Sequence, residues 1–176
     1  MTVPNPSAPN PAPLKAAPLK AASALFLRED EIRRGIELLY FGYIAMIRGA
    51  DAILEDEGLG RAHHRALYFI ARRPGLPVGE LLRLLAITKQ SLGRVLNELQ
   101  ARGLVLQQVG PQDRRQRLLR LTPEGDALEA RLFSQLQNRM ASAYAEAGQN
   151  AVTGFWAVLT GLVPTEDRPL VASLQA

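Results

Sequence analysis

Residues 77–121 read PVGELLRLLAITKQSLGRVLNELQARGLVLQQVGPQDRRQRLLRL, and this stretch decides the fold of the chain. Its leucines predict a short helix over 77–85, followed by a tight connection at 86–87. Thr88 is a typical N-cap residue, so a second helix is expected from there to about Arg102. The apolar side chains of this second helix recur at i, i+3, i+4 and i+7 and therefore face inward. They are Leu92, Val95, Leu96 and Leu99.

Gly103 supplies the C-cap of this helix, because glycine readily adopts the left-handed conformation that ends many helices. Two short strand-like runs follow, at 104–109 and 117–121. The segment between them, 110–116, is polar and rich in turn-forming residues, so the two runs are expected to form a hairpin with a basic tip. Two helices joined by a tight turn and followed by such a hairpin predict a winged helix-turn-helix.

The second of these helices carries side chains that suit double-stranded DNA. A major groove about 12 Å wide admits one helix, which must present polar side chains that the core does not need. Gln90 can pair bidentately with adenine, and Arg94 with guanine. The negative potential of the adjacent minor groove attracts Arg114 or Arg115 at the hairpin tip, where Asp113 would orient an arginine. The predicted DNA-binding residues are Thr88, Lys89, Gln90, Ser91, Arg94, Asn97, Arg114, Arg115 and Arg117.

Long helices are expected on both sides of this unit. Apolar periodicity predicts a helix over 29–57, roughly 40 Å long, which is too long for a lone small core and is expected to pack against another chain. A helix at about 63–72 comes next, and Thr122-Pro123 opens another that runs to about Glu146. A further helix is expected at 150–162. The predicted organisation is a disordered Pro/Ala-rich tail at 1–24, a dimerisation helix in 25–60, a DNA-binding lobe at 61–122 and C-terminal dimerisation helices in 123–176.

The charge of the 176-residue chain is concentrated in its middle. The formal net charge is only +4, but residues 61–121 hold twelve basic and three acidic side chains, a net +9 against −5 elsewhere. Such an excess is typical of a surface that binds a polyanion, most often nucleic acid, with a solvated arginine-rich surface as the alternative. The absence of cysteine excludes thiolate chemistry. No stretch approaches the ~18 apolar residues of a membrane helix, so a cytoplasmic protein is expected.

The same stretch resembles the DNA-binding core of MarR-type transcriptional regulators. The resemblance rests on Leu81 to Leu85, Thr88 to Leu99, Gly103-Leu104-Val105, Asp113-Arg114-Arg115 and LTPEG at 121–125. It implies a mainly α fold with a small β-hairpin wing, and a homodimer in which the terminal helices intertwine. It also implies that Arg115 reaches the minor groove and that promoters are regulated, usually by repression that a small ligand relieves. Recognition helices about 34–36 Å apart, one turn of DNA, would make the operator a pseudo-palindrome.

Other functions need features that the sequence lacks or leaves open. An enzyme would need a nucleophile with a base, a metal set or a glycine-rich phosphate loop, so no catalytic residue and no cofactor is expected. The adjacent His63 and His64 point about 100° apart on a helix and rarely share a metal ion, so a ligand contact or a role at the helix start is expected instead. Tyr40 and Tyr43 could line a small-molecule pocket or pack in the core. A non-specific architectural nucleic-acid binder, or a winged helix that binds protein, is the alternative function.

Overall fold

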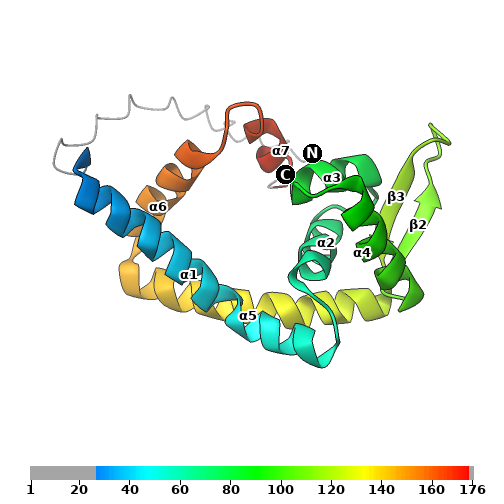
Figure 1. Cartoon of the computed structure of the whole chain (residues 1–176), viewed down its shortest axis with the longest axis horizontal. Helices are drawn as coiled ribbons and strands as arrows, with labels where there is room; N and C mark the ends of the chain where they lie inside the picture. Colours follow the sequence, from blue (N-terminus) through cyan, green and yellow to red (C-terminus); the bar gives the residue numbers. More distant parts are fainter. Residues whose placement is uncertain (1–26, 175–176) are drawn as a thin grey trace, which may run out of the picture. The chain divides into compact units, whose positions relative to one another are not determined.

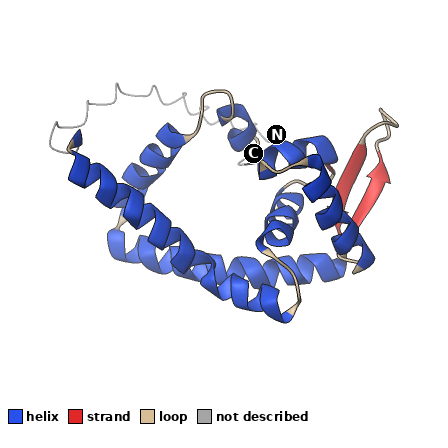
Figure 2. Cartoon of the chain, viewed as in Figure 1, coloured by secondary structure: helices blue, strands red, loops and turns tan. Residues whose placement is uncertain are grey.

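The computed structural model describes residues 27–174, and the tail expected to be disordered at 1–24 lies outside them. The described chain is helical apart from one small sheet (Figures 1 and 2). Its helices are α1 (Glu29–Asp56), α2 (Arg61–Arg72), α3 (Val78–Leu85), α4 (Lys89–Ala101), α5 (Pro123–Ala147), α6 (Gln149–Leu162) and α7 (Arg168–Ala172), and its strands are β1 (Leu76–Pro77), β2 (Val105–Val109) and β3 (Arg117–Leu121). The predicted helices and the two predicted strands are present, which confirms the mainly α fold with a wing. None of the described helices is long and apolar enough to cross a membrane.

The sheet has three antiparallel strands, whereas the sequence predicted only the two of the hairpin. The order is β1-β3-β2, and Leu76 of the additional strand pairs with Leu119. Gly75, at a φ of 89°, donates its N–H to the carbonyl of Leu119 at 2.8 Å. A two-residue strand has no alternation to detect, and its second residue, Pro77, lacks an N–H and is tolerated because the strand lies at the sheet edge.

The described residues fall into two compact units that divide within α1, between Tyr40 and Phe41. In the first unit, α1 exposes the apolar stripe that the periodicity predicted. The exposed fractions of Ile32, Ile36 and Leu39 are 48%, 63% and 45%. Large apolar side chains gathered on an exposed helix face indicate an interaction surface.

The core of the second unit forms around α2, which contacts α3, α4, α5 and β3. The inward face predicted for α4 is confirmed, since Leu92, Val95, Leu96 and Leu99 are all buried. Each such side chain stabilises the fold by about 1.5–3 kcal/mol when fully buried. One face of α4 is therefore held by the core, and the opposite face is left to solvent. The fully buried residues of this core include Leu54, Leu67, Ile70, Leu81, Leu99, Leu119 and Leu132.

Helices α1 and α4 end in the same way, with a glycine in the left-handed conformation. Gly58 has a φ of 62° and Gly103 a φ of 69°. The residue after each glycine donates its N–H back to the carbonyl five positions earlier, Leu59 to Leu54 at 2.8 Å and Leu104 to Leu99 at 2.9 Å. This arrangement is the Schellman motif, which satisfies part of the carbonyl groups at a helix end.

Thr122 and Gly125 join the base of the wing to α5. The Thr122 hydroxyl accepts a hydrogen bond from the N–H of Gly125 at 3.0 Å and donates one to the carbonyl of Gly103 at 2.6 Å. A Cβ on Gly125 would lie 2.0 Å from the backbone oxygen of Leu104. The sequence LTPEG therefore has a physical reason: the threonine links two helix ends, and the glycine permits their backbones to touch.

We expect Gly125→Ala to lower the free energy of unfolding by about 3 kcal/mol, because the clash is with backbone that cannot move without separating α5 from the wing. Gly93→Ala is the matched control, since its Cβ would meet nothing within 4 Å in a helix interior, and it should raise that free energy by up to about 1 kcal/mol. Urea unfolding followed by circular dichroism measures both. Equal effects of the two substitutions would contradict the close backbone contact.

Candidate nucleic-acid interface

The turn between α3 and α4 sets where α4 begins. Ala86 has a φ of 49°, in the left-handed region that non-glycine residues seldom adopt. Thr88 then caps α4: its hydroxyl oxygen accepts a hydrogen bond from the N–H of Ser91 at 3.1 Å, and the hydroxyl donates one to the Ser91 side chain at 2.9 Å. Thr88 and Ser91, both predicted to contact DNA, thus also serve the helix end, and they leave their remaining hydrogen-bonding capacity at the surface.

The outer face of α4 presents the predicted polar side chains. Lys89, Gln90, Arg94 and Asn97 are all exposed. Their side chains make no hydrogen bond and no ion pair with other residues of the described chain. They can therefore bind an external partner without first breaking an internal contact, and the first-turn N–H groups of the helix can meet a phosphate.

The tip of the wing is held by backbone contacts. Gly110 donates its N–H to the carbonyl of Gln116 at 3.0 Å, and Gln116 donates its N–H to the carbonyl of Asp113 at 3.0 Å. The carboxylate of Asp113 accepts the backbone N–H of Arg115 at 2.8 Å. Asp113 thus orients an arginine, as predicted, but through the backbone and not through the guanidinium. A Cβ on Gly110 would lie 2.8 Å from the Asp113 carbonyl oxygen, a requirement for glycine that sequence reasoning missed.

The three wing arginines differ in the contacts that their guanidinium groups make within the chain. Arg117 donates from its guanidinium to the backbone carbonyl of Arg114 at 3.2 Å and so braces the tip. The guanidinium groups of Arg114 and Arg115 make no ion pair within residues 27–174, and both side chains are exposed. The tip therefore presents two unpaired positive charges.

A groove of about 340 Å³ lies between α3, α4 and the wing and brings several of the predicted residues together. Its α4 wall includes Lys89 and Asn97, and Arg117 and Gln107 contribute from the wing. Gly93 also lines it, so a missing side chain on α4 opens part of the space. The groove thus has an apolar floor, which includes Leu82, Leu92 and Leu96, and polar and basic side chains from α4 and the wing stand along it.

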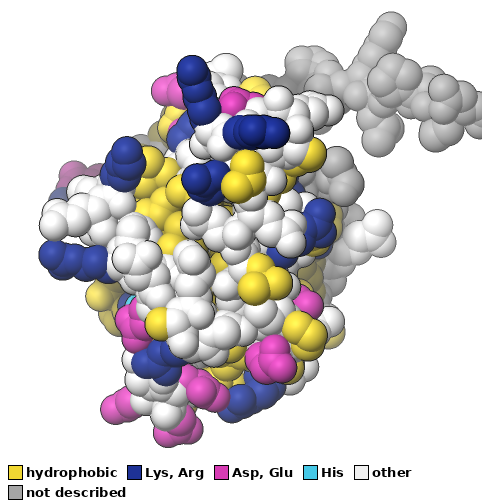
Figure 3. Space-filling model, turned by 90° about the vertical axis from the view of Figure 1, so that its right-hand side faces the viewer, with side chains coloured by type: hydrophobic (Ala, Val, Ile, Leu, Met, Phe, Trp, Pro, Cys, Tyr) yellow, Lys and Arg dark blue, Asp and Glu magenta, His cyan; other side chains and the backbone are white. Residues whose placement is uncertain are grey.

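Most of the basic residues in 61–121 are free of acidic partners. In the described part of the chain only three of the twelve form ion pairs: Arg61 with Asp51 at 2.7 Å, Arg73 with Glu80 at 2.7 Å, and Arg102 with Glu98 at 2.9 Å. Figure 3 views the molecule from the side of the wing; dark blue basic side chains are spread over much of this face, while most acidic side chains lie in its lower part. The positive charge thus remains available to a polyanion.

The two histidines occupy structural positions at the start of α2. The Nδ1 atom of His63 accepts the N–H of Gly60 at 3.0 Å, which is the helix-start role that the sequence predicted. His64 is 7% exposed, and its Nε2 atom has no hydrogen-bond partner among the described residues. Burial lowers the pKa of His64, and the nearby carboxylate of Asp51 partly opposes this effect. Within residues 27–174 no group of three or more histidine or acidic side chains is placed to hold a metal ion.

The two tyrosines proposed as ligand contacts lie on the surface. Tyr40 is 60% exposed and Tyr43 is 47% exposed, so neither is packed in the core of this chain, which was the alternative. A second groove, of about 600 Å³, lies between α1 and α5 and is lined by Arg48 and Arg139 among others. Neither groove is lined by the tyrosines or by the histidines.

Comparisons with known proteins agree with this geometry. The family described as the MarR family matches residues 57–116. The HTH-type transcriptional regulator PetP of Rhodobacter capsulatus is 46% identical over 139 residues, which cover 79% of this chain and 84% of PetP.

Two solved structures show a similar fold. NadR in complex with 4-hydroxyphenylacetate has a TM-score of 0.63 at 23% identity, covering 74% of this chain and 91% of NadR. A mutant MarR of E. coli complexed with operator DNA has a TM-score of 0.60 at 22% identity, covering 81% of this chain and 100% of that one. At these identities the two structures support the fold alone. Membership of the MarR family is supported by the family match and by the similarity to PetP.

The buried His64 predicts a loss of stability in acid. Its folded-state pKa lies below the ordinary value of 6.5, so its contribution to stability is present above about pH 6.5 and is lost as the pH falls through the folded-state pKa. We expect urea unfolding midpoints to fall between about pH 7.5 and pH 5, and to fall less in His64→Gln, which cannot be protonated in this range. The same pH dependence in both proteins would show that His64 is not responsible.

Proposed function

The chain belongs to the MarR family of transcriptional regulators, and we propose that it binds a specific double-stranded operator as a homodimer and represses transcription from it. One observation carries the proposal of specific binding. Gln90 and Arg94, the side chains best suited to read base edges, stand exposed and without internal partners on the outer face of α4. A non-specific architectural protein would need only the basic surface, without base-reading groups on the outer face of a recognition helix.

The exposed apolar surface supports the homodimer. On α6, Trp156 is 54% exposed and Phe155 is 38% exposed, although tryptophan and phenylalanine are among the residues that gain most from burial. Trp156 donates its indole N–H to the hydroxyl of Tyr144 on α5 at 2.9 Å, so the ring is held in place while its face stays open. Ile32, Ile36 and Leu39 of α1 are exposed as well. A second copy of the chain would cover such surfaces and place two recognition helices about one turn of DNA apart, on a pseudo-palindromic operator.

Control by a small ligand belongs to the same proposal. NadR, whose fold this chain shares, binds 4-hydroxyphenylacetate, and we extend small-ligand control to this chain. Tyr40 and Tyr43 would be ligand contacts, because exposed phenol rings offer both an apolar face and a hydroxyl. His63 and His64 are weaker candidates, since the first faces Gly60 and Glu98 and the second is buried. A ligand acts by binding one conformation of the dimer more tightly than another.

We expect Arg115→Ala to weaken operator binding by about 1–3 kcal/mol and to leave the dimer intact, because the arginine would contact only the minor groove. The salt dependence of binding should also become shallower, because one positive charge fewer displaces counterions from the DNA. Arg168→Ala on α7 removes the same charge outside α4 and the wing and should bind normally. Fluorescence anisotropy at several salt concentrations measures the effect, and unchanged affinity of Arg115→Ala would remove the wing from the interface.

Gln90→Ala and Arg94→Ala should each reduce discrimination between the operator and random duplex by about 1–3 kcal/mol, since each removes one base-reading contact. Gln137→Ala, exposed on α5, serves as the control. The wild-type chain should bind its selected operator at least about 10³-fold more tightly than random duplex. A uniform loss of affinity on all sequences would assign the two side chains to phosphates, and a wild-type chain without any preference would favour the non-specific alternative.

A further inference from the structure

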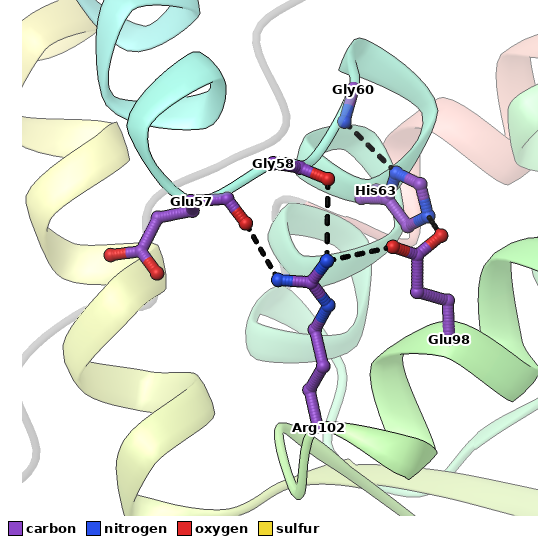
Figure 4. A network of polar contacts seen from close by, with 6 residues as sticks. All are labelled: Glu57, Gly58, Gly60, His63, Glu98 and Arg102. Atoms are coloured by element: carbon purple, nitrogen blue, oxygen red, sulfur yellow. Dashed lines mark hydrogen bonds and ion pairs between the residues drawn. The ribbon is translucent and has the colours of Figure 1, made fainter.

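The side chain of Arg102, the C-terminal capping residue of α4, binds the end of α1. Its guanidinium donates to the backbone carbonyl of Glu57 at 2.6 Å and to that of Gly58 at 3.3 Å (Figure 4). These two carbonyls belong to the capping residue of α1 and to its left-handed glycine, and they lie at the negative end of the helix dipole. We call this pair of hydrogen bonds the α1–α4 link.

Glu98 and Glu57 hold the link in place. One oxygen of the Glu98 carboxylate accepts from Arg102 at 2.9 Å, and the other lies 3.1 Å from Nε2 of His63, without the alignment of a hydrogen bond (Figure 4). Because Nδ1 of His63 accepts the N–H of Gly60, the neutral ring carries its proton on Nε2, which faces the carboxylate. The side chain of Glu57 pairs with Arg131 of α5 at 3.0 Å. The link and these two neighbouring ion pairs therefore connect α1, α2, α4 and α5.

The C-terminal end of α4 has two polar connections to the long helices. The α1–α4 link is one, and the hydrogen bond from Thr122, the capping residue of α5, to the carbonyl of Gly103 is the other. Apolar packing has little directionality, so these two polar contacts, made in different directions, restrict the orientation that α4 takes within its packing. Removing the α1–α4 link leaves the Thr122 contact and the apolar packing of α4, so the lobe stays folded and only the angle between α4 and α1 is less tightly fixed.

We propose that Arg102 and Glu98 are positioning residues that set the distance and angle between the two recognition helices of the dimer, and thus the half-site spacing that the protein accepts. The inference rests on the proposed function, since it needs a dimer on a two-part operator. Neither side chain needs to touch DNA, because Arg102 lies at the opposite end of α4 from the exposed Gln90 and points to α1. The link acts on spacing because it joins the helix that reads DNA to a helix whose apolar face is expected in the dimer.

The test compares operators that differ only in spacing. An operator obtained by selection from random duplex is resynthesised with one base pair inserted at its centre, which moves the half-sites by about 3.4 Å and about 34°. We expect the wild-type chain to lose about 30-fold or more in affinity on the longer operator, and Arg102→Gln to lose no more than about threefold. Glu98→Gln should change in the same direction by less. Arg102→Lys should recover part of the wild-type preference, because an ammonium keeps the charge but lacks the planar forked geometry of the guanidinium.

Arg73→Gln is the matched control. It breaks another ion pair of the same lobe, with Glu80 at 2.7 Å, at similar exposure, and it removes the same charge. We expect it to keep the wild-type spacing penalty, and sedimentation should show every variant as a dimer. The inference is overturned if Arg102→Gln keeps the full penalty or if Arg73→Gln relaxes it equally. A wild-type chain that binds selected and random duplex alike overturns the proposed function itself, and the inference with it.

Discussion

Backbone carbonyls at helix ends have no partner within their own helix, and the structure depends on how those of α1 and α4 are satisfied. Both helices end in a Schellman motif that leaves outward-pointing carbonyls. Arg102 binds those at the end of α1, and Thr122 binds that of Gly103 at the end of α4. Two side chains thus place the recognition helix relative to the long helices before it and after it. The hydrophobic core would hold these elements together without them but would specify their angles less sharply, because apolar contacts have little directionality.

This arrangement gives α4 a clear polarity. Its C-terminal end is engaged from two sides, while its N-terminal turn and outer face keep free donors and side chains. The wing follows the same pattern, since backbone hydrogen bonds and the Asp113 carboxylate hold the tip and the guanidinium groups of Arg114 and Arg115 stay unpaired. In both elements the internal polar contacts involve backbone groups and side chains other than those best suited to read or neutralise DNA, which remain available. That division is what a rigid surface for specific binding requires.

Much of the fold could be predicted because its signals are local. The inward stripe of α4 follows from the 3.6-residue period, the start of α5 from Thr122-Pro123, and the hairpin from a polar segment between two apolar runs. The exposed polar face of α4 followed directly from the same stripe. The sequence did not predict strand β1, because two residues show no periodicity and its pairing with β3 joins positions more than forty residues apart. The left-handed conformation of Ala86 was not predicted either, because alanine has no preference for that conformation.

The candidate site likewise combines features that the local sequence predicts with features that only the folded chain decides. Composition and spacing located the basic lobe, the recognition helix and the arginines of the wing, since charge and periodicity are properties of the sequence itself. Which of those charges have acidic partners was decided only by the folded chain, which pairs Arg61, Arg73 and Arg102 with carboxylates. His63 and Asp113 received their partners in the same way, and so did the link from Arg102 to Glu57, 45 positions earlier in the chain. The sequence determined the elements and their chemical faces through interactions over a few residues. Only tertiary structure decided which polar groups meet. A hydrogen bond between distant segments forms only when donor and acceptor are placed to within a few tenths of an ångström, and no local pattern encodes that placement.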